Sequence, residues 1–306
     1  MNRGRSLAAK IGTSMGAVIL LSLITFLFTR LSGDPAALLI PIDATYEELV
    51  QMRADLGLER SLLAQFVTFA TNALRGDFGF SLRYGQPAME LVLGRVPATL
   101  ELALSAALFG WLVAIPLGIL AGYRPNSMWD RIARFVGLFG QSMPVYWLGI
   151  LLIMFFSVRM RLLPASGRGS LGHLVLPSVA LSLNLMGSVT RILRASMVEI
   201  LRQDYIRTAL AKGVSREVLL FKHALKNAAI GVVTVIGLQL GSLLGGTVVT
   251  ETVFAWPGLG RFIVQSIQYR DFPVVQAGVL VLAVMIVVIH AVTDLVYPLL
   301  DSRVRV

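Results

Sequence analysis

Six long apolar segments constrain the fold of this chain more than any other feature of its sequence. As helices, stretches of about 18 or more apolar residues can cross the roughly 30 Å hydrocarbon core of a bilayer. The 56% share of hydrophobic residues and the mean hydropathy of +0.76 exceed those of ordinary soluble domains. We therefore predict an all-α polytopic membrane protein with six transmembrane helices, at residues 11–29, 97–122, 135–158, 174–193, 228–249 and 274–300.

Two alternatives for these segments are excluded by their composition. Strands of a membrane barrel would alternate apolar and polar residues, whereas residues 106–122 read AALFGWLVAIPLGILAG. The first segment follows three basic residues, as a secretory signal would. Its apolar core is longer than that of a usual signal, however, and no A-x-A cleavage pattern follows it. We expect residues 1–31 to be a retained transmembrane helix.

The basic residues indicate how the chain is oriented in the membrane. The 27 Lys and Arg exceed the 17 Asp and Glu, giving a net charge of +10. In a polytopic protein this excess is a topology signal, so we expect contact with membrane lipids and not with nucleic acid. The 191–227 loop carries eight basic residues, whereas 31–96 carries five Arg against eight acids. Both termini and the 191–227 loop are therefore predicted to be cytoplasmic.

Residues 32–96 are too long for a simple hairpin and have a mixed, soluble-looking composition. The stretch TYEELVQMRADLGL predicts a short helix capped by Thr45. We expect a small external subdomain at 32–96, followed by a transmembrane core at 97–301.

The sequence contains no motif that predicts a catalytic site. None of the lysines is followed by Ser or Thr, so the chain has no Walker A phosphate loop. The G-x-S-x-G match at residues 12–16 lies in a membrane segment with no preceding strand. Cysteine is absent, and the three histidines lack metal-ligand spacing. We predict no catalytic residue, no metal site and no cofactor in this chain, which excludes an enzyme embedded in the membrane.

The basic 191–227 loop contains a helix–turn–helix pattern. Asp204 can cap a short helix, Gly213 can close it in the left-handed conformation, and Ser215 can cap a second helix. One interpretation is an amphipathic pair whose cations face anionic lipids. The other is a docking element, in which small side chains let a partner approach closely. Spacing alone leaves both open.

Several motifs together resemble one family of transport proteins. Residues 205–228, YIRTALAKGVSREVLLFKHALKNA, resemble the EAA loop of permeases of ATP-binding-cassette (ABC) importers. Gly213 stands at the glycine of that motif, and Thr208, Ala209 and Leu210 stand where its E-A-A would fall. Six further stretches resemble the first permease subunit of the dipeptide, oligopeptide, nickel and glutathione branch of this family. They are SGDPA (32–36), GDFGFSL (76–82), VPATLELAL (96–104), ETVFAWPGLGR (251–261), DFPVVQ (271–276) and DLVYPLLDSRVR (294–305).

The resemblance implies a type I ABC importer fold in a bacterial or archaeal cytoplasmic membrane. It also implies three kinds of partner: a second homologous permease, two ATPase subunits that bind ATP and Mg, and an external substrate-binding protein. ATP would be hydrolysed in the ATPase subunits, and the loop at 196–227 would couple to them. The coupling residues that the resemblance implies are Asp204, Tyr205, Thr208, Ala209, Lys212, Gly213 and Ser215. The alternative function is a stand-alone channel or an ion-coupled secondary carrier.

Polar residues inside the apolar segments are candidates for the pathway, because they are costly against lipid. Each of them could instead hydrogen-bond a neighbouring helix. The candidates are Gln141, Ser142, Asn184, Gln239 and Ser242, with Pro144 as a kink beside the first two. Gly237, Gly241 and Gly245 recur every four residues and predict close helix packing.

An outer gate is predicted after the fifth apolar segment. Trp256 suits the membrane interface, and the three residues Pro257, Gly258 and Gly260 are expected to break the helix there.

Overall fold

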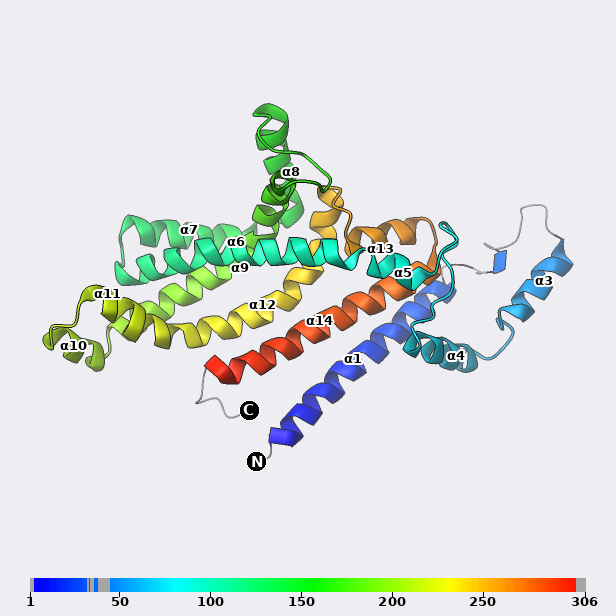
Figure 1. Cartoon of the computed structure of the whole chain (residues 1–306), viewed down its shortest axis with the longest axis horizontal. Helices are drawn as coiled ribbons and strands as arrows, with labels where there is room; N and C mark the ends of the chain where they lie inside the picture. Colours follow the sequence, from blue (N-terminus) through cyan, green and yellow to red (C-terminus); the bar gives the residue numbers. More distant parts are fainter. Residues whose placement is uncertain (1–2, 32, 34–35, 38–44, 301–306) are drawn as a thin grey trace. The chain divides into compact units, whose positions relative to one another are not determined.

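The computed structural model describes residues 3–31, 33, 36–37 and 45–300. Arg303, Arg305 and most of the SGDPA motif lie outside these ranges. Within them, an isolated bridge between Phe80 and Pro87 is the one strand-like pairing, and helices make up most of the rest (Figure 1). The prediction of an all-α protein is confirmed.

Five continuous helices are long and apolar enough to cross a membrane. They match five of the six predicted segments within a few residues at most ends, although α9 runs eight residues beyond the predicted end at 193. The five helices are α1 (Arg3–Leu31), α6 (Val96–Tyr123), α9 (Leu171–Leu201), α12 (Leu225–Val253) and α14 (Phe272–Leu300).

The segment at 135–158 is broken in two. Helix α7 (Met128–Ser142) and the pair formed by α8 (Val145–Leu152) and the π-helical segment η1 (Ile153–Arg159) meet at 110°. Met143 has an extended backbone, with φ of −86° and ψ of 119°, because the following Pro144 disfavours the helical region for the residue before it. Pro144 thus lies at the predicted kink. The third of the six expected spans corresponds to a pair of helices that bend sharply at this residue.

The described chain forms two compact units. The first contains residues up to Ala98 together with Gly258–Val287. Its helices are α1, α3 (Tyr46–Asp55), α4 (Leu62–Leu74), α5 (Ala88–Leu93), α13 (Leu259–Gln268) and the first part of α14. The domain boundaries at 31 and 96 stay a prediction.

Residues 45–96 are held to the rest of the first unit by aromatic and polar contacts. Phe26 of α1 stacks on Phe69 of α4, with ring centroids 5.6 Å apart. The buried carboxylate of Asp271 accepts hydrogen bonds from Ser81 Oγ at 2.5 Å and from the Leu82 N–H at 3.1 Å. The GDFGFSL stretch (76–82) and the DFPVVQ stretch (271–276) therefore meet in the fold, although about 190 residues separate them in sequence.

The predicted cap of α3 is confirmed. Thr45 Oγ1 accepts from the Glu48 N–H at 3.3 Å, and the Glu48 carboxylate accepts from the Thr45 N–H at 2.8 Å. This reciprocal pair satisfies two backbone donors at the start of the helix.

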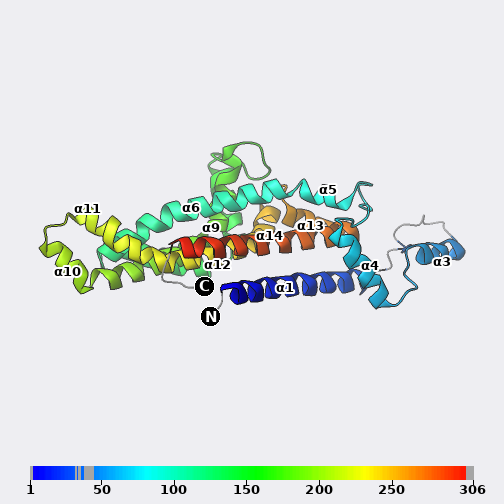
Figure 2. The ribbon, with the colours of Figure 1, turned by 60° about the horizontal axis from the view of Figure 1, so that its bottom comes forward.

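The second unit contains Thr99–Pro257 and the chain from Val288 onward. Within it α9 packs against α7, α8 and α12 (Figures 1 and 2). Helices α7 and α9 approach each other closely at two glycines. A Cβ atom on Gly140 would lie 2.5 Å from the Leu183 carbonyl oxygen, and one on Gly187 would lie 3.1 Å from the Val136 carbonyl oxygen. Side chains at either position would push the two backbones apart.

The glycines of α12 confirm close packing at two of three positions. Gly237 lies against Thr293 and Gly241 lies against His290, both from the end of α14 within the second unit. A Cβ atom on Gly245 would meet nothing within 4 Å.

We expect Gly140→Ala to lower the thermal stability of the protein. The added methyl group meets backbone atoms that cannot rotate away, and overpacking of this kind costs about 1–3 kcal/mol. Gly245→Ala is the matched control, since it adds the same methyl group to a helix interior in open space and should be neutral or slightly stabilising. Thermal unfolding midpoints of the purified protein in detergent would check this. Equal midpoints for the two variants would contradict the packing at Gly140.

Candidate functional site

Helix α10 (Asp204–Ala211) is a short element closed by a tight turn. The Val214 N–H donates to the Ala209 carbonyl at 3.2 Å, and the Gly213 N–H donates to the Leu210 carbonyl at 3.0 Å. This pair of bonds is a Schellman motif, which needs a left-handed residue, and Gly213 has a φ of +77°. The turn predicted at Gly213 is confirmed.

The start of α10 corrects one prediction. The N-cap is Gln203, without a side-chain cap, and Asp204 is the first residue of the helix. The exposed Asp204 carboxylate lies 3.6 Å from the Arg207 guanidinium, which contributes little at a solvated surface. The error has a simple cause, because Asp is favoured both at the cap and in the first turn.

The second helix of the loop continues without a break into α12, which is long and apolar enough to cross a membrane. Ser215 Oγ accepts from the Val218 N–H at 3.5 Å, at the start of α11 (Arg216–Val218). The π-helical segment η2 (Leu219–Ala224) then continues directly into α12. The predicted cap at Ser215 is therefore present, and α10 is joined closely to two long helices, α9 before it and α12 after it.

One face of α10 is anchored and the other is open. Ile206 is buried, and the Tyr205 hydroxyl accepts from Asn227 Nδ2 at 3.0 Å, which ties the helix to α12. Thr208 and Lys212 are exposed. The helix is thus held in position while it presents a free surface.

A second cluster lies along α7, α9 and α12 and contains four of the six predicted pathway residues. Ser188 is its centre and accepts from Gln141 Nε2 at 3.3 Å and from Gln239 Nε2 at 2.9 Å. Gln239 also donates to Asn184 Oδ1 at 3.4 Å, and Ser242 Oγ donates to Gln239 Oε1 at 2.9 Å. We call this set, together with Arg191, the amide cluster.

Two members of the amide cluster were not predicted from the sequence. One is Ser188, which is buried. The other is the exposed Arg191, whose Nη1 donates to Gln141 Oε1 at 2.7 Å. Arg191 lies in the predicted loop at 191–227, but α9 continues to Leu201. The spacing of Asn184, Ser188 and Arg191, at i, i+4 and i+7, places all three on one helix face and could have revealed them.

The remaining two pathway candidates lie at the α7–α8 break. Ser142 and Pro144 are both exposed there. Within the described part of the chain, no hydrogen bond joins Ser142 to the amide cluster.

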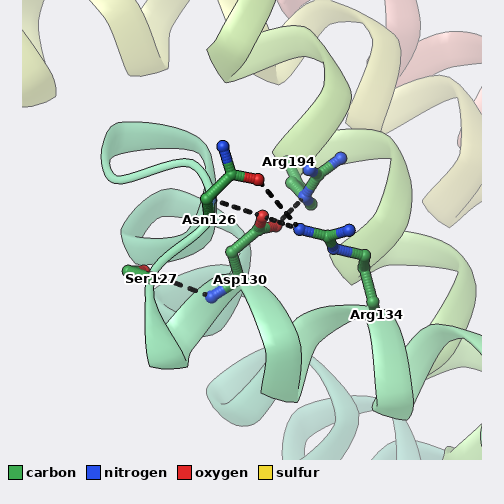
Figure 3. Close-up of polar contacts among 5 residues, drawn as sticks. All are labelled: Asn126, Ser127, Asp130, Arg134 and Arg194. Carbon is green, nitrogen blue, oxygen red and sulfur yellow. Dashed lines mark hydrogen bonds and ion pairs between the residues drawn. The ribbon is translucent and has the colours of Figure 1, made fainter.

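A third cluster fixes the start of α7 to α9, and sequence reasoning missed it (Figure 3). The Asp130 carboxylate is fully buried and pairs with Arg194 of α9 and with Arg134 at 2.5 Å. It also accepts from the Asn126 N–H at 2.8 Å, while Ser127 Oγ accepts from the Asp130 N–H at 3.4 Å. A buried carboxylate needs such partners, because an isolated buried charge is costly.

The predicted outer gate is rearranged in the structure. Trp256 is fully buried, so its side chain does not face outward, and its position at the depth of the membrane interface stays a prediction. The loop at 160–170 covers it: the Gly167 N–H donates to the Phe254 carbonyl at 2.9 Å, and the Arg168 guanidinium lies 5.9 Å from the Trp256 ring. Arg168 is held in turn by Glu101 at 2.5 Å.

The two glycines of the predicted gate also differ from each other. Gly258 is the N-cap of α13, whereas Gly260 lies inside that helix and does not break it. Pro257 and Gly258 therefore separate α12 from α13 without Gly260.

Comparison with known proteins decides the family. Residues 114–306 match the model of the binding-protein-dependent transport system inner membrane component, and residues 5–103 match the model of the N-terminal part of such components. The chain belongs to this family of importer permeases. Belonging to this family favours an importer over a stand-alone channel or carrier. A permease of this family works with a second permease, ATPase subunits and a substrate-binding protein.

Relatives and solved structures agree with this assignment. The chain is 37% identical over 329 aligned positions to the dipeptide transport system permease DppB of Escherichia coli (strain K12), covering 97% of each chain. It is 39% identical to the glutathione transport system permease GsiC of the same strain, covering 94% of each. An inward-facing MetNI methionine ABC transporter matches with a TM-score of 0.58 at 24% identity, over 70% of this chain and 97% of that one, which supports the fold.

Asp130→Ala should destabilise the protein by about 2–3 kcal/mol, because it removes a buried carboxylate with charged partners on two helices. Arg134→Ala is the control: that side chain is 51% exposed, so its loss should cost under about 1 kcal/mol. Thermal unfolding midpoints in detergent would compare them. A cost for Arg134→Ala as large as that for Asp130→Ala would contradict the assigned role of the buried charge.

Proposed function

We propose that this chain is the permease subunit of an ATP-driven importer for peptides or related small solutes, and that it forms half of the translocation pathway. The solute class is supported by the relatives, which are named as dipeptide and glutathione transport permeases. The second half would come from a homologous permease. ATP and Mg would bind to two separate ATPase subunits, since no lysine of this chain stands in a Walker A motif.

The observation that carries the coupling mechanism is the geometry of α10. The helix is anchored through Ile206 and Tyr205, has small residues at Thr208 and Ala209, and is closed rigidly at Gly213. Such a helix can insert its open face into a groove on an ATPase subunit. Closure of the ATPase pair on ATP would then displace α10 and, through it, α9 and α12.

Transport would follow from this displacement by alternating access. Nucleotide shifts the equilibrium between inward-open and outward-open states only if it binds them with different affinity. Helices α9 and α12 carry Asn184, Ser188, Gln239 and Ser242, so movement at α10 changes the environment of the amide cluster.

The amide cluster is our candidate for the pathway lining. Gln141, Asn184 and Ser242 are exposed in the isolated chain, although Asn184 and Ser242 belong to helices long enough to span a membrane and Gln141 belongs to the bent α7–α8 pair. Polar side chains at such positions face a cavity or another protein chain more often than lipid. We assign this face to the pathway shared with the second permease, with Ser142 and Pro144 near its edge.

The outer gate and the orientation complete the proposal. Trp256 lies against the 160–170 loop, which Arg168 and Glu101 hold in place, and with the following Pro257 this arrangement suits a closed gate at the external side. Gly258 and Gly260 would act as the start of α13. The positive-inside rule supports cytoplasmic termini and a cytoplasmic α10 in a bacterial or archaeal inner membrane.

Ala209→Arg tests the coupling role of α10. The long charged side chain should block the groove, so we expect loss of the ATPase subunits on co-purification and loss of ATP-driven uptake, with the second permease still bound. Ala54→Arg on α3 is the control, because it makes the same change on an exposed alanine of another short helix.

Two results would contradict the coupling role. One is an Ala209→Arg complex that keeps its ATPase subunits and full uptake. The other is a wild-type chain that purifies without any ATPase when it is co-expressed with its partner genes.

A further inference from the structure

Arg191 is an exposed charged residue on the face of α9 that carries the amide cluster. It lies ten residues before the end of α9 at Leu201, or about 15 Å along the helix axis. An exposed guanidinium beside a candidate pathway lining is suited to bind an anionic group.

The Arg191 side chain points away from the nearer end of α9. Side chains on a helix lean toward its N-terminus, here toward Leu171. The guanidinium accordingly reaches Gln141, and Gln141 in turn contacts Ser188, about one turn closer to the N-terminus of α9. The positive charge is therefore held among the amides and does not extend toward the α10 end.

No acid offsets this charge within the described chain. Among the described residues, no carboxylate lies within ion-pair distance of Arg191. The neighbouring Arg194, about one turn further along, is paired with the buried Asp130. Arg168 is likewise paired with Glu101. Arg191 thus differs from arginines of the same unit whose charge is already compensated.

The hydrogen bonds of the amide cluster engage each of its three amide side-chain oxygens once and leave several N–H donors open. The side-chain oxygens of Gln141, Asn184 and Gln239 each accept a bond from within the cluster. The guanidinium of Arg191 has five N–H donors, and Asn184 has two on its amide nitrogen. Both residues are exposed, and one N–H of Arg191 is used by Gln141. A ligand that meets this face should therefore be rich in acceptors and negatively charged.

We propose that Arg191, assisted by Asn184, binds the carboxylate of the transported solute as it passes this half of the pathway. The inference rests on the proposed function, because it takes the amide cluster as pathway lining. A guanidinium binds a carboxylate through two parallel hydrogen bonds, which makes such pairs strong and directional. Peptides of any side-chain composition share a terminal carboxylate, so one arginine could serve solutes of varied sequence.

A binding experiment without the binding protein tests this assignment. The permease–ATPase complex is placed in discs of phosphatidylcholine, and its thermal midpoint is measured with alanyl-alanine or with alanyl-alanine amide. We expect the acid to raise the midpoint of wild type and the amide to raise it much less. Arg191→Gln should weaken acid binding tenfold or more, Arg191→Lys should weaken it less, and Arg131→Gln, which removes an exposed charge elsewhere, should leave it unchanged.

Other sources of negative charge give different results, and each overturns the proposal. Stabilisation by added phosphatidylglycerol that depends on Arg191, with none by the acid, would identify a lipid headgroup as the ligand. A lower midpoint of Arg191→Gln in the absence of any probe, again with no effect of the acid, would identify a carboxylate of the partner permease. Equal binding of acid and amide by wild type would show that the carboxylate is not recognised.

Uptake into proteoliposomes separates failure of this inference from failure of the proposed function. If wild type with its binding protein imports no peptide, the proposed solute class is wrong. If wild type imports peptides and Arg191→Gln imports them equally well, with the same apparent KM and maximal rate, only the role of Arg191 is wrong.

Discussion

The close approach of α7 and α9 at Gly140 and Gly187 is the contact on which the functional half of this chain depends. Because neither residue has a side chain, the two backbones can meet, with a Cβ on Gly140 only 2.5 Å from a carbonyl oxygen. This contact lets Gln141 reach Ser188 on one side of the glycines. Toward the start of α7, the buried Asp130 fixes the same pair of helices by its ion pair with Arg194. Packing and charge thus set one relative position for α7 and α9.

Helix α9 links the amide cluster to α10 through a continuous hydrogen-bonded backbone. It runs unbroken from Leu171 to Leu201, with Asn184, Ser188 and Arg191 on one face and α10 beginning three residues after its end. A continuous helix transmits displacement with little bending. In the mechanism proposed here, a push on α10 is therefore felt at the amides, and the Asp130 cluster keeps α7 moving with α9.

Features set by local sequence could be predicted, and those set by tertiary contacts could not. The spans follow from apolar length, the Gly213 turn from its need for a positive φ, and the Thr45 cap from its partner Glu48. The burial of Trp256 could not be predicted, because it depends on a loop about 90 residues earlier in sequence. The spacing of Ser188 from Asn184 could mark a shared helix face, but its hydrogen bonds to glutamines on two other helices could not be predicted from it.

The central claim is that the amide cluster lines a water-accessible pathway that responds to ATP. The chain has no cysteine, so single cysteines can be introduced without removing any. In the assembled importer, Asn184→Cys and Ser242→Cys should react with a membrane-impermeant maleimide, and ATP should change their rates. Leu112→Cys, on an exposed apolar position of α6, should stay unreactive. If the cysteines at 184 and 242 react as slowly as that at 112 in every nucleotide state, the cluster faces lipid or protein and the pathway lies elsewhere.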